Sequence, residues 1–420
     1  DVHGYDRVES RITNELQKEG THIHFEEDTT AIPQGVDLVI YTPAIPSTHK
    51  ELVHFRNTNI PVIKRAEALG IISRSQKTIA IAGTHGKTTT STLVTHILRT
   101  GGVDCTAFLG GISNDLNSNF VFGKSDWVVV EADEFDRSFL HLNPYYSVVT
   151  STDADHLDIY GTHDVMLESF KEFSEKNNKK GEVFLHEDVD DKIERKGNIS
   201  SHNYGIGTGK NKASNIRVIN GFFHFDFQGE DISIKDIKTT LPGRHNITNA
   251  TAAIILALKI GVSANAIKEA LASFKGIWRR FEFQIRREDF VYIDDYAHHP
   301  SELNAAIGAA KELFPNKEIT GIFQPHLYTR TRDFAQGFAE SLDTLNNVLL
   351  MDIYPAREEP IENVTSDMLV NLMQNKRIKR VSKENLLHQL ELSKPQVLLT
   401  LGGSAITNEN GDFTLRLPQN

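Results

Sequence analysis

The sequence has a single cysteine among its 420 residues, and this scarcity removes two kinds of structure. Cys105 has no second thiol in the chain, so an internal disulfide and a zinc cage built from several cysteines are both excluded. Low cysteine content is typical of proteins that work in a reducing cytoplasm, which is the compartment we expect.

Long apolar runs are also missing. The longest candidate, 250–260, falls short of the roughly 18 residues expected of a membrane-spanning helix, and Lys259 interrupts it. Residues 1–7 do not resemble a secretory signal and do not begin with Met, so we expect the chain to start inside a domain. We therefore predict no membrane insertion.

An excess of positive charge is absent as well. The chain carries 45 Lys and Arg against 56 Asp and Glu, a net charge of −11. A dedicated nucleic-acid-binding protein normally shows a basic face or stripe, so we expect no nucleic acid partner. Nucleotides are not excluded, because a few local cations and backbone amides are enough to hold a phosphate.

Short strands and helices alternate along the chain and predict an α/β protein with several domains. The polar seam 74–77 separates a first block, 1–75, from a second, 76–276, and a third block, 277–420, repeats strand, loop and helix. Strands that alternate with helices of about ten or more residues indicate parallel βαβ units. The second block also contains a β-rich insertion with a phenylalanine-rich, hairpin-like run around 215–235.

The strongest local signal is an apolar strand, 78–82, that leads into Gly83-Thr84-His85-Gly86-Lys87-Thr88-Thr89 and then into a helix. Backbone N–H groups at the start of such a helix point at anionic oxygens, and the helix dipole strengthens the attraction. The lysine offers a charge to the β- and γ-phosphates, and the threonine after it offers a hydroxyl to Mg²⁺. Ile81 replaces the first glycine of the full Walker pattern, yet the strand–loop–helix context predicts nucleotide binding.

Acidic and histidine side chains follow the next two predicted strands. Glu131 comes directly after the strand 127–130, and His156 lies in the acidic segment after the strand 147–150. The carboxyl ends of parallel strands meet at one edge of the sheet, beside the phosphate loop. Because Mg²⁺ prefers hard oxygen ligands and keeps waters, we expect this edge, with the hydroxyl of Thr88, to hold the metal ions that bridge the phosphates.

The third block repeats this layout at two further strand ends. One strand leads into Asp294-Asp295-Tyr296-Ala297-His298-His299-Pro300, and the next leads into the segment 324–332. Histidine, tyrosine and arginine side chains clustered at two neighbouring strand ends indicate a site for an anionic substrate.

Seven motifs, occurring in this order, resemble those of the Mur ligases over nearly the whole chain. They are Gly83-Thr84-His85-Gly86-Lys87-Thr88-Thr89-Thr90, Glu131-Ala132-Asp133-Glu134, Asp155-His156-Leu157-Asp158, Gly243-Arg244-His245-Asn246-Ile247-Thr248-Asn249-Ala250, Arg279-Arg280-Phe281-Glu282, Asp294-Asp295-Tyr296-Ala297-His298-His299-Pro300 and Pro325-His326-Leu327-Tyr328-Thr329-Arg330. The ordered set is specific to this superfamily, and the last two motifs point to its alanine-adding member.

The resemblance implies three domains. An N-terminal Rossmann-like domain for the UDP-sugar spans 1–75 and is expected to lack its first strand and glycine-rich loop. A central P-loop ATPase domain with a parallel sheet and a small β insertion spans 76–276, and a Rossmann-like domain for the amino acid spans 277–420. A monomer or weak dimer is expected.

The resemblance also implies the reaction, with ATP and Mg²⁺ as cofactors. The lactyl carboxylate of UDP-N-acetylmuramate takes the γ-phosphoryl group, and the amine of L-alanine attacks the resulting acyl phosphate. Phosphate leaves and an amide remains, as a step of peptidoglycan precursor synthesis and hence of cell wall formation.

Site roles are carried over by the resemblance, residue by residue. The ATP-binding set is Gly83, Thr84, His85, Gly86, Lys87, Thr88, Thr89, His245, Asn246, Asn249, Arg280 and Asp295. The metal set is Thr88, Glu131 and His156. The set for alanine and acyl transfer is Tyr296, His298, His326 and Arg330. Catalytic roles fall to Lys87, His156, His298 and Arg330.

One position departs from the family pattern. Family members commonly carry arginine after the Pro-His pair, and this chain has Leu327. One contact to the alanine carboxylate is then either lost or supplied from elsewhere, with Arg332 as a candidate.

Other functions stay open. A recycling ligase that joins UDP-N-acetylmuramate to a preformed peptide shares most of the motifs, and an inactive nucleotide-binding homologue shares the phosphate loop. Folate or cyanophycin-type ligases fit the third block poorly. A Rossmann oxidoreductase is disfavoured, because no Gly-x-Gly-x-x-Gly fingerprint follows a strand.

Overall fold

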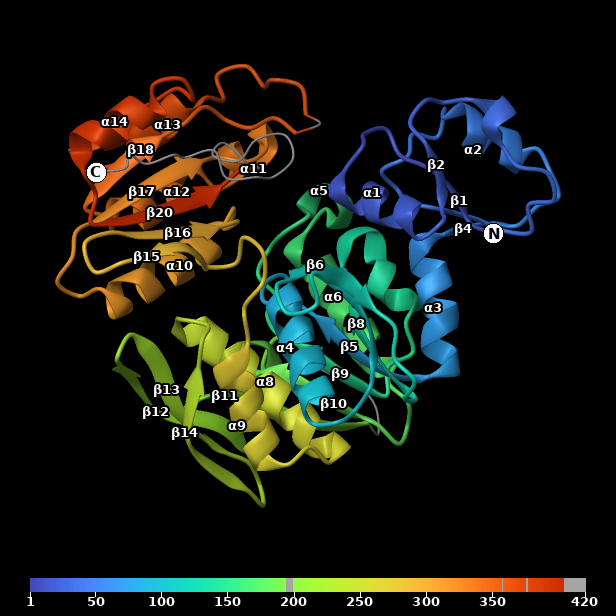
Figure 1. Ribbon diagram of the computed structural model, residues 1–420, viewed down its shortest axis with the longest axis horizontal. Helices are drawn as coiled ribbons and strands as arrows, with labels where there is room; N and C mark the ends of the chain where they lie inside the picture. Colours follow the sequence, from blue (N-terminus) through green and yellow to red (C-terminus); the bar gives the residue numbers. More distant parts are fainter. Residues whose placement is uncertain (194–198, 357, 375–376, 404–420) are drawn as a thin grey trace. The chain divides into compact units, whose positions relative to one another are not determined.

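The computed structural model describes residues 1–193, 199–356, 358–374 and 377–403. The chain forms two compact units, one of residues 1–75 and one that begins at Gln76 and contains the rest of the described chain (Figure 1). This boundary falls in the polar seam that the sequence indicates. The predicted α/β class with parallel sheets is confirmed.

The first unit contains two short parallel strand pairs, β1 with β2 and β3 with β4. Its first helix begins where Ser10 and Thr13 cap each other: the Thr13 N–H donates to Ser10 Oγ at 3.2 Å and the Ser10 N–H donates to Thr13 Oγ1 at 2.8 Å. The elements are β1 (His3–Tyr5), α1 (Arg11–Lys18), β2 (His22–His24), the 3₁₀ helix η1 (Thr29–Ala31), β3 (Val39–Tyr41), α2 (Lys50–Arg56), β4 (Val62–Lys64) and α3 (Arg65–Ser75).

The larger unit is built on two separate sheets. The first has ten strands in the order β14-β13-β12-β11-β10-β9-β5-β8-β6-β7, parallel from β12 through β6 and antiparallel at both edges. Its elements are β5 (Lys77–Ala82), α4 (Lys87–Thr100), β6 (Thr106–Ser113), β7 (Ser118–Val121), β8 (Trp127–Glu131), η2 (Phe135–His141), β9 (Tyr146–Val149), α5 (Leu157–Tyr160), α6 (His163–Glu175), β10 (Glu182–His186), α7 (Glu187–Asp190), β11 (Ser200–Ile206), β12 (Asn211–Ile219), β13 (Phe222–Gln228), β14 (Ser233–Thr239), α8 (Arg244–Ile260) and α9 (Ala264–Ser273).

The phenylalanine-rich insertion is the outer part of this sheet. Asn220 and Gly221 both have positive φ, 51° and 74°, which suits a tight hairpin turn between β12 and β13. Alternate phenylalanines of β13 then face the core, where Phe223, Phe225 and Phe227 are all at most 1% exposed. The insertion therefore extends the ten-stranded sheet and does not form a separate body.

The second sheet has six strands in the order β15-β16-β20-β17-β18-β19. Five strands are parallel as the βαβ pattern predicts, and β15 is an antiparallel edge strand that the sequence did not indicate. The elements are β15 (Glu282–Arg286), β16 (Val291–Asp295), α10 (Pro300–Leu313), β17 (Ile319–Gln324), α11 (Tyr328–Asp333), α12 (Ala335–Asp343), β18 (Asn347–Leu350), α13 (Ser366–Leu372), β19 (Ile378–Arg380), α14 (Leu386–Ser393) and β20 (Val397–Gly402). The predicted end of this block at 420 lies outside the described residues.

The linker 276–281 joins the two sheets and is bonded to one of them at each end. Its first half pairs with β6, where the Trp278 N–H donates to the Ile112 carbonyl at 3.0 Å. Its second half is held by the other sheet, where the Tyr296 N–H donates to the Arg279 carbonyl at 2.8 Å. Arg279 has a φ of +57°, a sparsely populated backbone region for a non-glycine residue.

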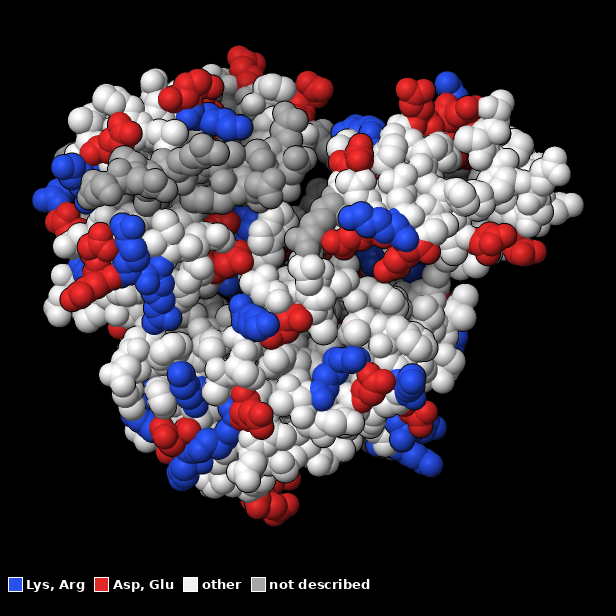
Figure 2. Space-filling model, viewed as in Figure 1, with Lys and Arg blue, Asp and Glu red and all other residues white. Residues whose placement is uncertain are grey.

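The surface charge is mixed. On the face drawn in Figure 2, acidic and basic side chains of the described residues are interspersed and form no continuous basic stripe. Among the described residues, every helix is too short or too polar to cross a bilayer.

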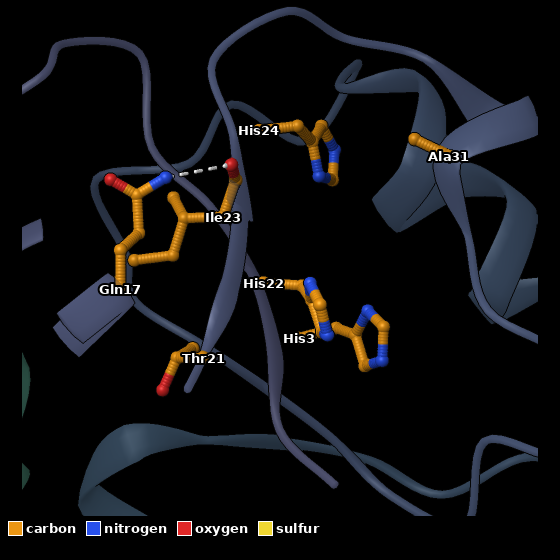
Figure 3. A pocket seen from close by; sticks show the side chains of 7 residues that line it. All are labelled: His3, Gln17, Thr21, His22, Ile23, His24 and Ala31. Atoms are coloured by element: carbon orange, nitrogen blue, oxygen red, sulfur yellow. Dashed lines mark hydrogen bonds between the residues drawn. The ribbon is translucent and has the colours of Figure 1, made fainter. Parts of the chain in front are cut away.

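A hollow of about 380 Å³ lies along the β1–β2 pair of the first unit (Figure 3). The rings of His3 and His22 stack there with centroids 5.0 Å apart, and Gln17 Nε2 donates to the Ile23 carbonyl at 3.4 Å. Ligands of parallel α/β sheets usually bind beyond the carboxyl ends of the strands. This hollow is lined by the whole of β2, from His22 to His24, and is not confined to that end.

Candidate active site

The phosphate loop connects the buried strand β5 to helix α4. Gly83 has a φ of +131°, and a Cβ there would lie 2.1 Å from Thr150 Oγ1 and 2.8 Å from the Ser151 amide, so the loop can approach β9 this closely only with glycine. The His85 N–H donates to Ser151 Oγ at 2.8 Å and Thr84 Oγ1 lies 2.9 Å from the same oxygen. The loop is therefore held by the segment that follows β9.

Gly86 ends the loop in a left-handed conformation, with a φ of +83°, and begins α4. A Cβ there would lie 2.6 Å from Asn249 Oδ1. That oxygen is not free to move, because it accepts from Thr90 Oγ1 at 3.2 Å and the Asn249 amide donates to Asn246 Oδ1 at 3.2 Å. Asn246 and Asn249 of α8 thus pack directly behind the loop.

Gly86→Ala is expected to destabilise the protein by about 2–4 kcal/mol and to weaken nucleotide binding, because it combines a strained φ with a steric clash. Gly102→Ala is a matched control at the other end of α4, with a φ of +85° and nothing within 4 Å of the added Cβ. Its cost should be only the backbone strain, about 1 kcal/mol. Denaturant unfolding of both variants measures the difference, and equal costs would contradict the clash.

Lys87 is the first residue of α4 and carries the positive charge of the loop. Its ammonium donates to the Gly83 carbonyl at 2.6 Å and to Glu134 Oε1 at 2.8 Å, and it lies 2.7 Å from Glu134 Oε2. Burial disfavours the ammonium, but the charges of Glu134 and Glu131 outweigh burial and raise the pKa of Lys87. The ammonium therefore stays charged at the start of α4.

Glu131, at the end of β8, meets the start of α4. Its carboxylate accepts from Thr88 Oγ1 at 3.1 Å and from the Gly110 N–H at 2.9 Å, and a Cβ at Gly110 would lie only 2.1 Å from Oε1. Burial raises the pKa of Glu131, and Lys87, Thr88 and Gly110 oppose that rise. Thr88 and Glu131, both predicted as metal ligands, thus lie together, with the hydroxyl of one hydrogen-bonded to the carboxylate of the other.

These oxygens suit Mg²⁺, which keeps several waters and takes few protein ligands. No group of three or more His, Cys, Asp or Glu side chains that could hold a metal occurs within the described ranges. A Mg²⁺ ion at Thr88 and Glu131 would therefore complete its shell with phosphate oxygens and water.

His156 caps α5 in a left-handed conformation, with a φ of +51°. Its Nε2 atom lies 3.8 Å from Glu134 Oε1 and 3.8 Å from Asp155 Oδ2. Asp155 also meets the second sheet, because Arg330 Nη2 of α11 lies 3.6 Å from its Oδ1. His156 thus lies between Glu134, the partner of Lys87, and Asp155, the partner of Arg330.

His85 bridges the phosphate loop and the N-terminal end of α10. Its Nε2 atom lies 2.9 Å from Ser301 Oγ and 3.4 Å from Asp153 Oδ2, and its Nδ1 atom lies 3.3 Å from Glu302 Oε1. The ring also lies against His299, with centroids 4.7 Å apart. Burial disfavours the imidazolium, but Asp153 and Glu302 outweigh burial and raise the pKa of His85 to about 9.

This shift predicts a pH-dependent contribution to stability. Because the folded pKa of about 9 exceeds the ordinary 6.5, the stabilisation by His85 is complete below pH 6.5 and is lost as pH rises through 9. The difference in unfolding free energy between wild type and His85→Gln should shrink over that range by about 1–3 kcal/mol.

His245→Gln is the matched control, since burial lowers the pKa of His245 to about 4 and this ring stays neutral over the same range. The difference in unfolding free energy between His245→Gln and wild type should stay constant between pH 6.5 and 9. A difference for His85→Gln that also stays constant would show that His85 is not charged in the folded protein.

Tyr296, His298 and His326 form an aromatic cluster at the carboxyl ends of β16 and β17. The rings of Tyr296 and His298 are 4.8 Å apart, and each lies 6.1 Å from His326. The guanidinium of Arg280 lies 5.8 Å from the Tyr296 ring. Burial lowers the pKa of His298, and lowers that of His326 to about 4, so burial favours neutral imidazoles here.

Asp295 is buried at the end of β16 and holds the backbone on both sides of the site. Its two oxygens accept from the Phe281 N–H at 2.8 Å and from the Ala297 N–H at 2.7 Å. Burial raises the pKa of Asp295 to about 7. Its contacts position the linker and the His298 loop.

Several polar side chains in these contacts were not predicted as site residues, among them Glu134, Asp153, Ser301 and Glu302. Glu134 is fully buried and belongs to the motif Glu131-Ala132-Asp133-Glu134. Its position three residues after Glu131 is the sequence feature that could have identified it as a site residue. Ser301 and Glu302 read as ordinary first-turn residues of a helix, and Asp153 as a residue of an acidic loop. Their partner, His85, is more than 200 residues away from α10.

Known proteins resemble the chain over all of these elements. Residues 1–77, 81–257 and 279–405 match three domains of one family, described as "Mur ligase family, catalytic domain", "Mur ligase middle domain" and "Mur ligase, glutamate ligase domain". The UDP-N-acetylmuramate--L-alanine ligase of Flavobacterium psychrophilum is 47% identical over 414 residues, which cover 96% of this chain and 90% of that protein.

Solved structures agree with this likeness. The UDP-N-acetylmuramate-alanine ligase of Thermotoga maritima has a TM-score of 0.81 and 28% identity, covering 97% of this chain and 91% of that one. A murein peptide ligase from Psychrobacter arcticus shares the fold, with a TM-score of 0.67 and 20% identity over 98% of this chain and 91% of that one.

Proposed function

The chain belongs to the Mur ligase family, and we propose that it is an ATP-dependent ligase that joins L-alanine to the lactyl carboxylate of UDP-N-acetylmuramate. The observation that carries the proposal is the meeting of two clusters in one compact unit. The phosphate loop with Lys87 touches the segment that bears His298, through the contacts of His85 with Ser301 and Glu302. Identity of 47% to an alanine ligase supports the choice of amino acid.

The chemistry explains why cations surround the loop. A carboxylate is a poor electrophile, and the phosphoryl group taken from ATP gives it a leaving group. Two anions must approach each other for that transfer, so we assign Lys87 and Arg280 to neutralising the phosphates. Mg²⁺ held by Thr88 and Glu131, with His156 nearby, supplies further positive charge to the phosphates when it is bound.

The amino-acid side follows from the second sheet. We assign Arg330 to the alanine carboxylate, because its guanidinium already lies 3.6 Å from another carboxylate, Asp155. A neutral His298 beside Tyr296 can accept a proton from the attacking amine. Leu327 has a φ of +73° and its N–H donates to the Tyr354 carbonyl at 2.9 Å, so its backbone shapes this loop without an arginine side chain.

Further expectations belong to the same proposal. We assign 1–75 to the UDP-sugar, 76–276 to ATP and 277–420 to the amino acid, and the three family matches support this division. Within the ATP site, Gly83, Thr84, His85, Gly86 and Thr89 would form the loop and Asn246, Asn249, His245 and Asp295 its support. His326 would line the amino-acid site. A cytoplasmic enzyme, monomeric or weakly dimeric, would draw on the cell's ATP and Mg²⁺.

Phosphate release tests the proposal. The 420-residue chain is incubated with ATP, Mg²⁺ and UDP-N-acetylmuramate, with and without L-alanine, and beside a preformed tripeptide. Release that depends on L-alanine is the expected result. Phosphate release with the tripeptide but not with L-alanine would assign the chain to peptide recycling. If no phosphate is released with either acceptor, the chain is not a ligase.

A further inference from the structure

Glu302, in the first turn of α10, is an acidic side chain that meets both the phosphate loop and the loop that bears His298. Only 16% of its side chain is exposed. Its partners come from three separate segments: the phosphate loop, the linker and the loop after β16. The ordinary explanation of such a glutamate is a helix cap, because a carboxylate in the first turn favours the helix dipole.

The two carboxylate oxygens of Glu302 have different tasks. Oε2 accepts from the His298 N–H at 2.9 Å and lies 3.5 Å from His298 Nδ1, which is the cap and the local contact. Oε1 faces away from the helix, toward His85 Nδ1 at 3.3 Å and Arg280 Nη1 at 3.8 Å. A contact that only stabilises the start of the helix needs Oε2 alone. Helix stability therefore does not explain why Oε1 lies close to His85 and Arg280.

We propose that Glu302 is a positioning residue that couples nucleotide binding to the amino-acid site, by holding His85 of the phosphate loop, Arg280 of the linker and His298 in one polar cluster. The inference rests on the proposed function. The loop backbone around His85 is fixed on its other side by Ser151, so a side-chain contact at Glu302 sets where the loop stands relative to His298. A nucleotide that orders the phosphate loop then also orders the loop that bears His298.

Glu302→Gln separates the two tasks. The amide oxygen can still accept from the His298 N–H and keep the cap, but the negative charge between His85 and Arg280 is gone. We expect the Kd of a non-hydrolysable ATP analogue with Mg²⁺, measured by calorimetry, to rise about tenfold, as is usual for the loss of one coupled charge contact. The KM for L-alanine should rise by a similar factor, and the KM for UDP-N-acetylmuramate should stay within about twofold.

A double-mutant cycle tests whether the effect passes through His85. If it does, the analogue should bind His85→Gln/Glu302→Gln no more weakly than the weaker single variant. The matched control is Glu312→Gln on the same helix, because Glu312 Oε1 accepts from Arg244 Nε of α8 at 3.1 Å and so makes another ion pair between the same two halves, with 35% of its side chain exposed. That variant should change each constant by less than about twofold, as exposed pairs usually do.

Three results would overturn the proposal. They are unchanged nucleotide affinity in Glu302→Gln, tighter binding through removal of an acid near the phosphates, and strictly additive effects in the cycle. If Glu302→Gln does not fold, Glu302→Asp, which keeps the charge on a shorter side chain, replaces it in the cycle. The calorimetric cycle needs neither UDP-N-acetylmuramate nor L-alanine, so a wrong acceptor would refute the proposed function alone and leave the coupling result readable.

Discussion

Alanine in place of Lys87 is expected to lower kcat by about 10³-fold, because it removes the only ammonium of the phosphate loop from the charges that develop during phosphoryl transfer. Phosphate release with ATP, UDP-N-acetylmuramate and L-alanine measures the loss. Lys259→Ala is the control, since Lys259 belongs to the same unit and pairs with Glu182 at 2.8 Å far from the loop. It should leave kcat within about twofold, as surface ion pairs contribute little.

The same substitution also strands Glu134, whose side chain is 0% exposed. A buried charge that loses its partner costs about 3–5 kcal/mol of stability, so lower activity alone would not identify a role in catalysis. Lys87→Met with Glu134→Gln removes both charges together. That double variant should regain most of the stability and none of the activity, and near-normal phosphate release by it would refute the role of Lys87.

Glutamine in place of Glu131 is expected to raise the Mg²⁺ concentration for half-maximal activity at least about tenfold and to lower kcat, because the amide keeps the shape but loses the anionic ligand. A Mg²⁺ titration of phosphate release is the measurement. The Gly110 N–H, at 2.9 Å, still finds an acceptor in the amide oxygen, so the local fold should survive.

Gly110→Ala offers an independent test of the same contact. Its Cβ would lie 2.1 Å from Glu131 Oε1, so it displaces the carboxylate without removing the charge. It should reproduce the Mg²⁺ defect of Glu131→Gln. A Mg²⁺ dependence that neither variant changes would exclude Glu131 from the metal site.

The parts of this protein that the sequence predicted are those with a local signal. The strand β5, the glycines at 83 and 86 and the helix α4 follow one another directly, and each has a periodic or conformational reason visible within a few residues. Helix α1 likewise begins at Arg11 for a local reason, the mutual capping of Ser10 and Thr13.

The parts that were missed depend on distance along the chain. No periodicity brings His85 to Ser301 and Glu302, because that contact exists only after two sheets have folded and packed. Strand β6 was missed because Gly110 and Gly111 interrupt its apolar pattern, and the glycine at 110 is needed there to let Glu131 approach. A glycine is unfavourable inside a strand, and here its reason is the close contact with Glu131 at the proposed metal site.

The linker between the two sheets also constrains mechanics. Trp278 is hydrogen-bonded to β6 and Arg279 to the loop after β16, so the chain changes from one sheet to the other within the short segment 277–280. If one half rotated against the other about this segment, Arg280 would lie close to the axis, and Arg330 and α11 would move further. Such a hinge would keep the phosphate contacts of Arg280 nearly fixed during closure, and most of the travel would fall to the residues that receive the amino acid.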